Sequence, residues 1–366
     1  MATFSFSQFS SFAGVSAAFC SSALVSPSTC LRQPTFSPTR RSSPRRFSAR
    51  LFASSSLLLF LLLSCTSPAQ VGARTISVPD LHGDYERGIS ILQHAGLIEP
   101  ANLDHEDKPL WIGGDAKLVQ TGDMVDRGDH GRELYLMFQR LHKEAKEAGG
   151  EVVNLLGNHE LMNLQEDLRY VTDGDVAEFG GMDERKQAWS EEGWLGSWVR
   201  TFPALAKVDN VLFSHAGLPL KFLEGEHTLD DVNDGIAMAI SPGNANERGK
   251  ALMQESSFSQ RALLGDSGPL WTRFYSKRGN PSMCSVLREV LERTGAHRMV
   301  VGHTIQYSSK DGFKVRPDCG GRLLLADTAV SRAYRGVPSY IEHDGEGGAV
   351  AVYPSLGTKE PLNLEL

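Results

Sequence analysis

The stretch Gly122-Asp123-Met124-Val125-Asp126-Arg127-Gly128 decides the fold of this 366-residue chain. It comes directly after the apolar residues 118–121, which are typical of a buried strand, so it lies at the carboxyl end of that strand. Ligand-binding and catalytic groups of open α/β sheets gather at such ends. By itself, this dense charge is equally compatible with a polar loop that contains an internal ion pair.

The segments on either side repeat this arrangement of a strand followed by a polar motif. Residues 74–78 are rich in β-branched side chains and lead into Asp80 and His82, and residues 151–156 lead into Gly157-Asn158-His159-Glu160. If the backbone stays extended after the first strand, Asp80 and His82 point the same way, which suits two ligands of one ion.

Amphipathic helices are predicted between these strands, at 85–96 and 130–148, because apolar residues recur there at helical spacing. The alternation of strands and helices, with one motif after each strand, predicts a largely parallel layer with right-handed crossovers. Further elements are predicted at 211–213, 299–301, 322–326, 339–342 and 349–353 as strands, and around 286–291 as a helix.

Two regions are predicted to build the surface around the strand ends. Residues 161–200 are expected to form a helical cap, which Trp189, Trp194 and Trp198 pack onto the body of the domain. Residues 220–275 are rich in loops and are expected to form an insertion near the mouth of the site.

Two isolated histidines, His215 and His303, follow later strands, each beside a glycine. A single histidine after a strand is usually structural, but so many strand ends that combine Gly with Asp, Asn or His are difficult to explain by packing alone. These ligand types, without thiolates, suit divalent ions such as manganese, iron and zinc. Two such ions can stabilise both oxygens of an in-line phosphoryl displacement, and the adjacent Arg127 can bind phosphoryl oxygens through its planar fork.

The cysteines outside the leader, Cys284 and Cys319, lie far apart in the sequence and lack the spacing of a zinc site. They are predicted to be buried thiols, with a regulatory disulfide as the less favoured alternative.

The first acidic residue of the chain is Asp80, although seven arginines and many serines precede it. An Arg- and Ser-rich segment without acids is typical of an organelle transit peptide. Residues 1–73 are therefore predicted to be a transit peptide that is removed, and residues 74–366 a single catalytic domain. The apolar residues 57–63 are too few to span a bilayer, and either direct the protein to an inner compartment or are cut away with the leader.

Without residues 1–79 the chain is strongly acidic, because 30 Lys and Arg remain against all 44 acidic residues, a formal net charge of −14. Proteins that bind nucleic acid need a basic surface, so nucleic acid is not expected as a partner. Docking on a membrane surface is not expected either, and no membrane span is predicted in the mature protein.

Residues 79–83, 122–128 and 157–160, with the two later histidines, resemble the GDxHG, GDxVDRG and GNHE motifs of the phosphoprotein phosphatases. These enzymes belong to the calcineurin-like metallophosphoesterases. Among them, residues 75–354 most resemble the Shewanella-like protein phosphatases, bacterial-type members found in plants and some other eukaryotes. The resemblance implies an α/β fold in which two mixed β-sheets are sandwiched between helices, with a dinuclear metal site at the strand ends.

The resemblance also implies a role for each residue of the site. Two divalent ions, expected to be manganese with iron or zinc as alternatives, would be held by Asp80, His82, Asp123, Asn158, His215 and His303, with Asp123 as the bridging ligand. His159 would be the general acid that protonates the leaving oxygen, and Asp126 would orient it. The substrate phosphate would be bound by Arg127, Arg273 and Asn158.

Two positions depart from the motifs of the family. Pro79 stands where GDxHG has its first glycine, which stiffens the backbone but leaves both metal ligands in place. Residues 326–331, Ala-Asp-Thr-Ala-Val-Ser, stand where the eukaryotic Ser/Thr branch has SAPNYC, so the groove residues of that branch cannot be transferred to this chain.

The predicted function is that of a phosphoprotein phosphatase, which hydrolyses phosphate monoesters on Ser, Thr or Tyr of a phosphoprotein or phosphopeptide by in-line attack of a metal-bridging hydroxide. The same motifs serve hydrolases of dinucleoside polyphosphates, which are the alternative. An inactive metal-binding scaffold is a remote third reading, because every ligand is present. The transit peptide and the resemblance to plant members predict a chloroplast location, with the mitochondrion as the alternative.

Overall fold

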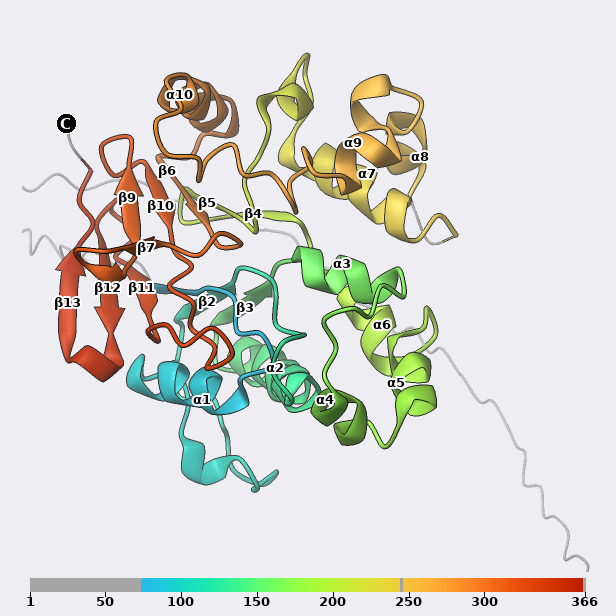
Figure 1. Cartoon of the computed structure of the whole chain (residues 1–366), viewed down its shortest axis with the longest axis vertical. Helices are drawn as coiled ribbons and strands as arrows, with labels where there is room; N and C mark the ends of the chain where they lie inside the picture. Colours follow the sequence, from blue (N-terminus) through green and yellow to red (C-terminus); the bar gives the residue numbers. More distant parts are fainter. Residues whose placement is uncertain (1–73, 244–245, 365–366) are drawn as a thin grey trace, which may run out of the picture. The chain divides into compact units, whose positions relative to one another are not determined.

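The computed structural model describes residues 74–243 and 246–364 (Figure 1). The predicted transit peptide and the apolar residues 57–63 lie outside the described residues. No helix of the described part is long and apolar enough to cross a bilayer.

Two β-sheets form the centre of the fold, with the strand orders β13–β12–β11–β1–β2–β3 and β4–β5–β6–β10–β9. The first sheet consists of β1 (Thr75–Val78), β2 (Lys117–Gln120), β3 (Glu151–Asn154), β11 (Tyr340–His343), β12 (Ala349–Tyr353) and β13 (Thr358–Pro361). The second consists of β4 (Leu205–Val208), β5 (Val211–Ser214), β6 (Arg298–Val301), β9 (Arg316–Asp318) and β10 (Leu323–Leu325). A separate two-stranded ribbon is formed by β7 (Tyr307–Ser308) and β8 (Gly312–Phe313).

Three strands of each sheet run parallel to one another, namely β1, β2 and β3 in the first and β5, β6 and β10 in the second. The outer strands pair antiparallel with them. The prediction of a parallel layer with a motif after each strand therefore holds for β1, β2 and β3, while β5, β6 and β10 form a second parallel set, and each sheet as a whole is mixed.

The two faces of each strand explain the layered core, because successive side chains of a strand point to opposite faces. In β10, Leu324 belongs to an apolar cluster that contains Val119 of the first sheet and Phe213 of the second, so this cluster lies between the sheets. The neighbouring Leu323 and Leu325 belong to the larger cluster that includes the helices. The fold is thus the predicted pair of mixed sheets between helices.

Figure 1 shows α1 and α2 on the side of β2 and β3, and α10 on the side of β5 and β6. The helices are α1 (Tyr85–His94), α2 (Gly131–Glu147), α3 (Asn158–Leu164), α4 (Asp173–Glu178), α5 (Met182–Trp189), α6 (Trp194–Val199), α7 (Leu229–Ile240), α8 (Glu247–Leu252), α9 (Gln260–Leu264) and α10 (Met283–Thr294). Single 3-10 turns are η1 (Pro100–Asn102), η2 (Leu220–Leu223), η3 (Ser256–Phe258) and η4 (Pro354–Leu356).

The predicted cap corresponds to α3–α6, and two of its three tryptophans pack it onto the body. The rings of Trp189 and Trp198 meet the buried Tyr135 of α2 edge-on, with ring centroids 5.7 and 6.2 Å apart. Trp194 differs from the prediction, because its side chain is 38% exposed and stacks on Phe179 within the cap.

The prediction that residues 220–275 are rich in loops is wrong, because this segment contains α7, α8 and α9. A capping box starts α7: the Thr228 hydroxyl accepts from the Asp231 N–H, and the Asp231 carboxylate accepts from the Thr228 N–H. Val232 and Ile236 then bury one face of the helix. Scattered acids hide this start signal when the segment is judged by composition.

The prediction of two buried thiols is also wrong, because Cys284 on α10 and Cys319 in the turn between β9 and β10 form a disulfide. Their Cα atoms are 5.3 Å apart although 35 residues separate them in the sequence. Both residues are partly exposed. Only the packing of α10 beside this turn brings them together, and sequence spacing carries no trace of it.

Candidate active site

The site lies where the six parallel strands end. Each of these strands is followed within a few residues by an Asp, Asn or His: Asp80 after β1, Asp123 after β2, Asn158 after β3, His215 after β5, His303 after β6 and Asp327 after β10. Two contacts join the strand ends of the two sheets. The His303 N–H donates to Asp80 Oδ2 over 2.9 Å, and His215 Nε2 lies 2.9 Å from Asn158 Oδ1.

The backbone turns sharply at these strand ends. His82, Asp123, Asp126, Arg127 and His303 all have positive φ, between 43° and 70°. The expectation of an extended backbone through His82 is therefore wrong, since its φ is 43°. A left-handed non-glycine residue costs about 1–3 kcal/mol and persists only where its surroundings hold it.

Two glycines permit the close approach of the strand ends that the sequence suggested. A Cβ on Gly157 would lie 2.3 Å from Asp123 Oδ1, and a Cβ on Gly302 would lie 2.2 Å from Asp80 Oδ1. Any larger residue at either position would therefore displace a carboxylate of the site.

Three atoms that could bind a metal converge between the sheets. Asn158 Oδ1 lies 2.9 Å from His215 Nε2 and 2.8 Å from His303 Nδ1, and the two imidazole nitrogens are 3.2 Å apart. His215 Nδ1 lies 2.8 Å from the Thr121 carbonyl, which only accepts, so this nitrogen carries a proton. Although burial opposes it, the Asp123 carboxylate raises the pKa of His215 to about 10, so the oxygens of Asn158 and Asp123 favour a positive charge at Nε2. A metal ion bound at Nε2 would supply that charge in place of the proton.

These separations match the ligands of a bound transition metal. Bonds of about 2.0–2.2 Å place adjacent ligands roughly 3 Å apart. The observed distances run from 2.8 Å to the 3.4 Å between His215 Nε2 and Asp123 Oδ2. The carbonyl that holds the other nitrogen of His215 is the usual support of a metal-binding histidine.

A second group of side chains shares Asp123 with the first, and in it His82 is the predicted ligand and His159 the predicted general acid. His82 Nε2 and His159 Nε2 lie 3.8 and 3.9 Å from Asp123 Oδ2. Asp123 Oδ1 is occupied by the His159 N–H, so Oδ2 faces both groups, as a bridging ligand must. His82 Nδ1 donates to the Val125 carbonyl, which leaves Nε2 free to bind an ion. Asp80 is buried beside the same carboxylate.

The buried carboxylates of the site also favour bound cations. Burial, with Asp327 as the next cause, raises the pKa of Asp80 well above its usual range, and burial raises the pKa of Asp327 as well. Among the described residues, no Lys or Arg forms an ion pair with either carboxylate or with Asp123. The donor set, in which three buried carboxylates lack a Lys or Arg partner in the described chain and face histidines, therefore fits two divalent ions.

A chain of buried, hydrogen-bonded side chains fixes the orientation of His159 through its Nδ1. Its Nδ1 donates to Asp126 Oδ2 over 2.6 Å, and Asp126 Oδ1 accepts from the Asn163 amide. Arg185 donates to Asn163 and, over 2.6 Å, to Asp175, so the cap anchors the chain. Although burial opposes it, the carboxylates of Asp123 and Asp126 raise the pKa of His159.

Glu160 holds the motifs at 122–128 and 157–160 together, a role that the sequence did not indicate. Its carboxylate accepts from the N–H groups of Asp123, Met124 and Gly157 over 2.8–2.9 Å, and from the Tyr135 hydroxyl. It is fully buried, so each of these bonds compensates the burial of its charge. Only the spatial meeting of β2 and β3 could reveal this function.

The ligands open into a pocket of about 380 Å³, which both predicted arginines line. The Arg127 guanidinium lies 3.7 Å from the centre of the Tyr170 ring, and Arg273 donates to the Thr304 hydroxyl over 2.9 Å. In the described chain, neither arginine forms an ion pair with a carboxylate. Both guanidinium groups are therefore available to an anionic ligand.

The rest of the pocket shows what sequence reasoning missed. Asp327 lines it, although residues 326–331 were considered only for the signature that they lack. The sequence does contain a pattern that could have identified Asp327, because an apolar strand precedes it. Unlike the other strand ends, however, this one has no glycine near the polar residue. Aromatic walls are added by Tyr170, Tyr334 and Trp271. Within the segment 220–275, only Trp271 and Arg273 line the pocket, so α7–α9 do not form its mouth.

Comparisons with known proteins agree with this geometry. The profile of the calcineurin-like phosphoesterases matches residues 73–307. Shewanella-like protein phosphatase 1 of Plasmodium berghei is 30% identical over 264 residues, which cover 70% of this chain and 67% of that protein. Shewanella-like protein phosphatase 2 of Arabidopsis thaliana is 26% identical over 332 residues, 79% of this chain and 80% of that protein. The crystal structure of a cold-active protein tyrosine phosphatase superposes with a TM-score of 0.63 at 25% identity, over 79% of this chain and 78% of that one.

Proposed function

The chain belongs to the calcineurin-like phosphoesterases and, within them, to the Shewanella-like protein phosphatases, and from this premise we propose that its preferred substrate is phosphotyrosine in proteins. It is a metal-dependent protein phosphatase, and hydrolysis of dinucleoside polyphosphates is not favoured. The choice of phosphotyrosine over phosphoserine and phosphothreonine goes further and rests on the walls of the pocket.

The observation that carries this proposal is the set of aromatic side chains around the phosphate-binding arginine. The Arg127 guanidinium lies on the Tyr170 ring, and Tyr334 packs against His82 with ring centroids 5.1 Å apart. Trp271 stands beside His303. A phenyl ring that enters between such walls gains edge-to-face contacts, whereas the short side chain of phosphoserine would not reach them. The related cold-active structure is named as a tyrosine phosphatase.

The chain's own groups account for binding and proton transfer. Arg127 and Arg273 would hold the phosphoryl oxygens by charge-assisted hydrogen bonds. His159 has Nδ1 engaged by Asp126, so Nε2 faces the pocket. Although burial opposes it, Asp123 and Asp126 raise the pKa of His159, which favours the protonated form that donates to the leaving oxygen. Divalent ions, held by Asp80, His82, Asp123, Asn158, His215 and His303, would supply Lewis-acid polarisation of the phosphoryl group when bound.

The test is a comparison of kcat/KM on a phosphotyrosine peptide, the matched phosphothreonine peptide and diadenosine tetraphosphate. We expect a preference of at least about a hundredfold for the phosphotyrosine peptide, which corresponds to roughly 2.7 kcal/mol of differential transition-state binding. Asp123→Asn serves as the blank. Equal or faster hydrolysis of the phosphothreonine peptide would overturn the proposal, and a nucleotide preference would also overturn the assignment as a protein phosphatase.

We further propose manganese as the metal and the chloroplast as the location. The ligand set of carboxylate, amide and imidazole groups suits manganese, and activity of the metal-free protein restored by manganese ahead of zinc or iron would support it. The acid-free, Arg-rich composition of residues 1–73 supports plastid import. Fusion of this segment to a fluorescent protein in plant cells tests the location, and mitochondrial fluorescence would contradict it.

A further inference from the structure

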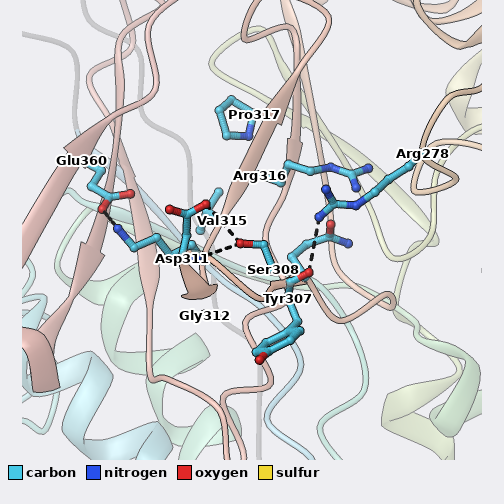
Figure 2. Close-up of a pocket in the computed structure, with 11 residues that line it drawn as sticks. Arg278, Tyr307, Ser308, Asp311, Gly312, Val315, Arg316, Pro317 and Glu360 are labelled. Atoms are coloured by element: carbon cyan, nitrogen blue, oxygen red, sulfur yellow. Dashed lines mark hydrogen bonds and ion pairs between the residues drawn. The ribbon is translucent and has the colours of Figure 1, made fainter.

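Figure 2 shows a second pocket, of about 330 Å³, and two of its lining residues directly follow two of those of the active-site pocket in the sequence. Thr304 and Ile305 line the active-site pocket, and the next two residues, Gln306 and Tyr307, line the second one. Consecutive Cα atoms are only about 3.8 Å apart, so a single segment separates the two pockets. Ile305 of the active-site pocket and Tyr307 of the second pocket are 37% and 58% exposed, and we call this connecting segment the rim.

Two guanidinium groups, of Arg278 and Arg316, lie together on one side of this pocket, as Figure 2 shows. Each is held by a backbone carbonyl: Arg278 donates to the Tyr307 carbonyl over 3.4 Å, and Arg316 donates to that of Ser276 over 3.0 Å. Burial, followed by the nearby positive charge of Arg278, lowers the pKa of Arg316. The two like charges are therefore kept close together by backbone contacts that do not neutralise them.

Carboxylates of the described chain leave this pair of guanidinium groups largely uncompensated. Arg278 forms no ion pair with any of them, and Arg316 forms one, with the Asp318 carboxylate 3.9 Å from its Nε. That Nε is buried without a hydrogen-bond partner among the described residues. The Asp318 carboxylate therefore faces Arg316 as an ion pair without a hydrogen bond, and one carboxylate against two guanidinium groups leaves the pair with a net positive charge.

The other charged groups of the pocket are already paired or bonded. Lys314 forms an ion pair with Glu360, and the Asp311 carboxylate accepts from the Ser308 hydroxyl. An incoming anion would therefore bind at Arg278 and Arg316. This local positive site is notable on a body whose formal net charge is −14 without residues 1–79.

We propose that Arg278 and Arg316 form a second anion site of the substrate-binding surface, which binds an acidic side chain of the phosphopeptide, either a carboxylate or a second phosphate. The inference rests on the proposed function, because the peptide is the phosphatase's own substrate. An extended peptide advances about 3.3 Å per residue, so a side chain within four positions of the phosphotyrosine can cross the rim at Ile305 and Tyr307. Guanidinium groups bind both carboxylate and phosphate through paired hydrogen bonds.

The experiment measures kcat/KM on a set of phosphotyrosine peptides in which one position at a time, from four before to four after the phosphotyrosine, is Ala, Glu or phosphoserine. In the wild-type protein we expect at least one position where Glu or phosphoserine raises kcat/KM roughly tenfold over Ala, with an advantage that shrinks at high salt. Glu alone or phosphoserine alone at that position identifies which of the two anions the site takes.

Three variants connect this preference to the pocket. Arg278→Ala, whose side chain is exposed, should abolish the preference while leaving kcat/KM on p-nitrophenyl phosphate unchanged, because that small substrate does not reach the second pocket. Asp311→Asn retains an acceptor for Ser308 and should enlarge the preference, since a competing negative charge is removed. Arg261→Ala removes an exposed arginine that lines neither pocket and should change nothing.

The outcomes separate this inference from the proposed function. If the peptides are hydrolysed but no acidic position is favoured, or if Arg278→Ala keeps the preference, the anion site is disproved and the phosphatase assignment stands. If p-nitrophenyl phosphate is hydrolysed and no phosphotyrosine peptide is, the proposed function itself fails.

Discussion

The two β-sheets contribute to the site in different ways. The first sheet supplies dense motifs at 79–83, 122–128 and 157–160, whereas the second supplies single residues, His215, His303 and Asp327. In the structure, each sheet supplies one half of the site, and both halves lie similarly close to the shared carboxylate. Asp123 Oδ2 is 3.4 Å from His215 Nε2 of the second sheet and 3.8 Å from His82 Nε2 of the first. A dense motif therefore shows that one loop combines several functional residues. It does not show that its metal ligands contribute more to metal binding than the isolated ligands of the second sheet.

Asp123→Asn is expected to have the largest effect, because this residue alone belongs to both halves. Loss of the shared carboxylate oxygen should remove both ions and lower kcat/KM on the order of 10³–10⁴-fold. Metal analysis together with kinetics checks this. A variant that still holds two ions per chain would show that Asp123 does not bridge the halves.

His82→Asn and His303→Asn test whether the two sheets matter equally. Each should leave about one ion per chain, because each histidine serves only one group of ligands, and each should lower kcat on the order of 10²–10³-fold. Metal content and kcat of the two variants are measured side by side. A mild defect in His303→Asn alone would contradict the equality of the halves, and the denser motif would then mark the more important ligand.

Asp126→Asn should weaken catalysis less, by about 10–100-fold, because it orients His159 without touching the substrate. His159 must be protonated to donate, and Asp126 helps to raise its pKa, so the variant should lose activity at a lower pH than the wild type. The pH profile of kcat on a phosphotyrosine peptide shows this shift. Unchanged profiles in the variant and wild type would contradict the orienting role.

His343→Gln is expected to have the smallest effect, and it concerns a buried histidine at the far end of the first sheet. His343 is opposite Thr75 at the start of β1, and its Nε2 lies 3.0 Å from the Ser77 hydroxyl. Burial lowers its pKa to about 3, below the 6.5 of the unfolded chain. The unfolded state therefore binds more protons, and the free energy of unfolding should fall by about 1.4 kcal/mol per pH unit below pH 6.5.

Urea unfolding of the metal-free protein at pH 5 and pH 7 measures this slope, because it avoids acid release of the ions. The glutamine variant can still bond to Ser77 and should lose part of the pH dependence without any change in kcat. The same slope in variant and wild type would show that His343 is not responsible for it.

Much of the site could be predicted because each motif is local. Asp123, Asp126 and Arg127 lie within five residues of one another, directly after a strand whose apolar pattern is visible in the sequence. The fold of two mixed sheets followed from the resemblance that these motifs carry, and the structure confirms it. Helices α7–α9 were missed for a local reason, since the capping box of Thr228 and Asp231 was outweighed by the polar composition around it.

The sequence by itself determined the chemistry of the protein: acceptors and imidazoles at strand ends, with a guanidinium beside them, in a chain that needs divalent ions. The tertiary structure decided which distant groups meet. The bond between Cys284 and Cys319, the hold of Glu160 on two motifs and the paired charges of Arg278 and Arg316 all join segments from separate elements. Residue identity fixes what a side chain can bind, but strand register and helix packing fix its neighbours, and these depend on the whole chain at once.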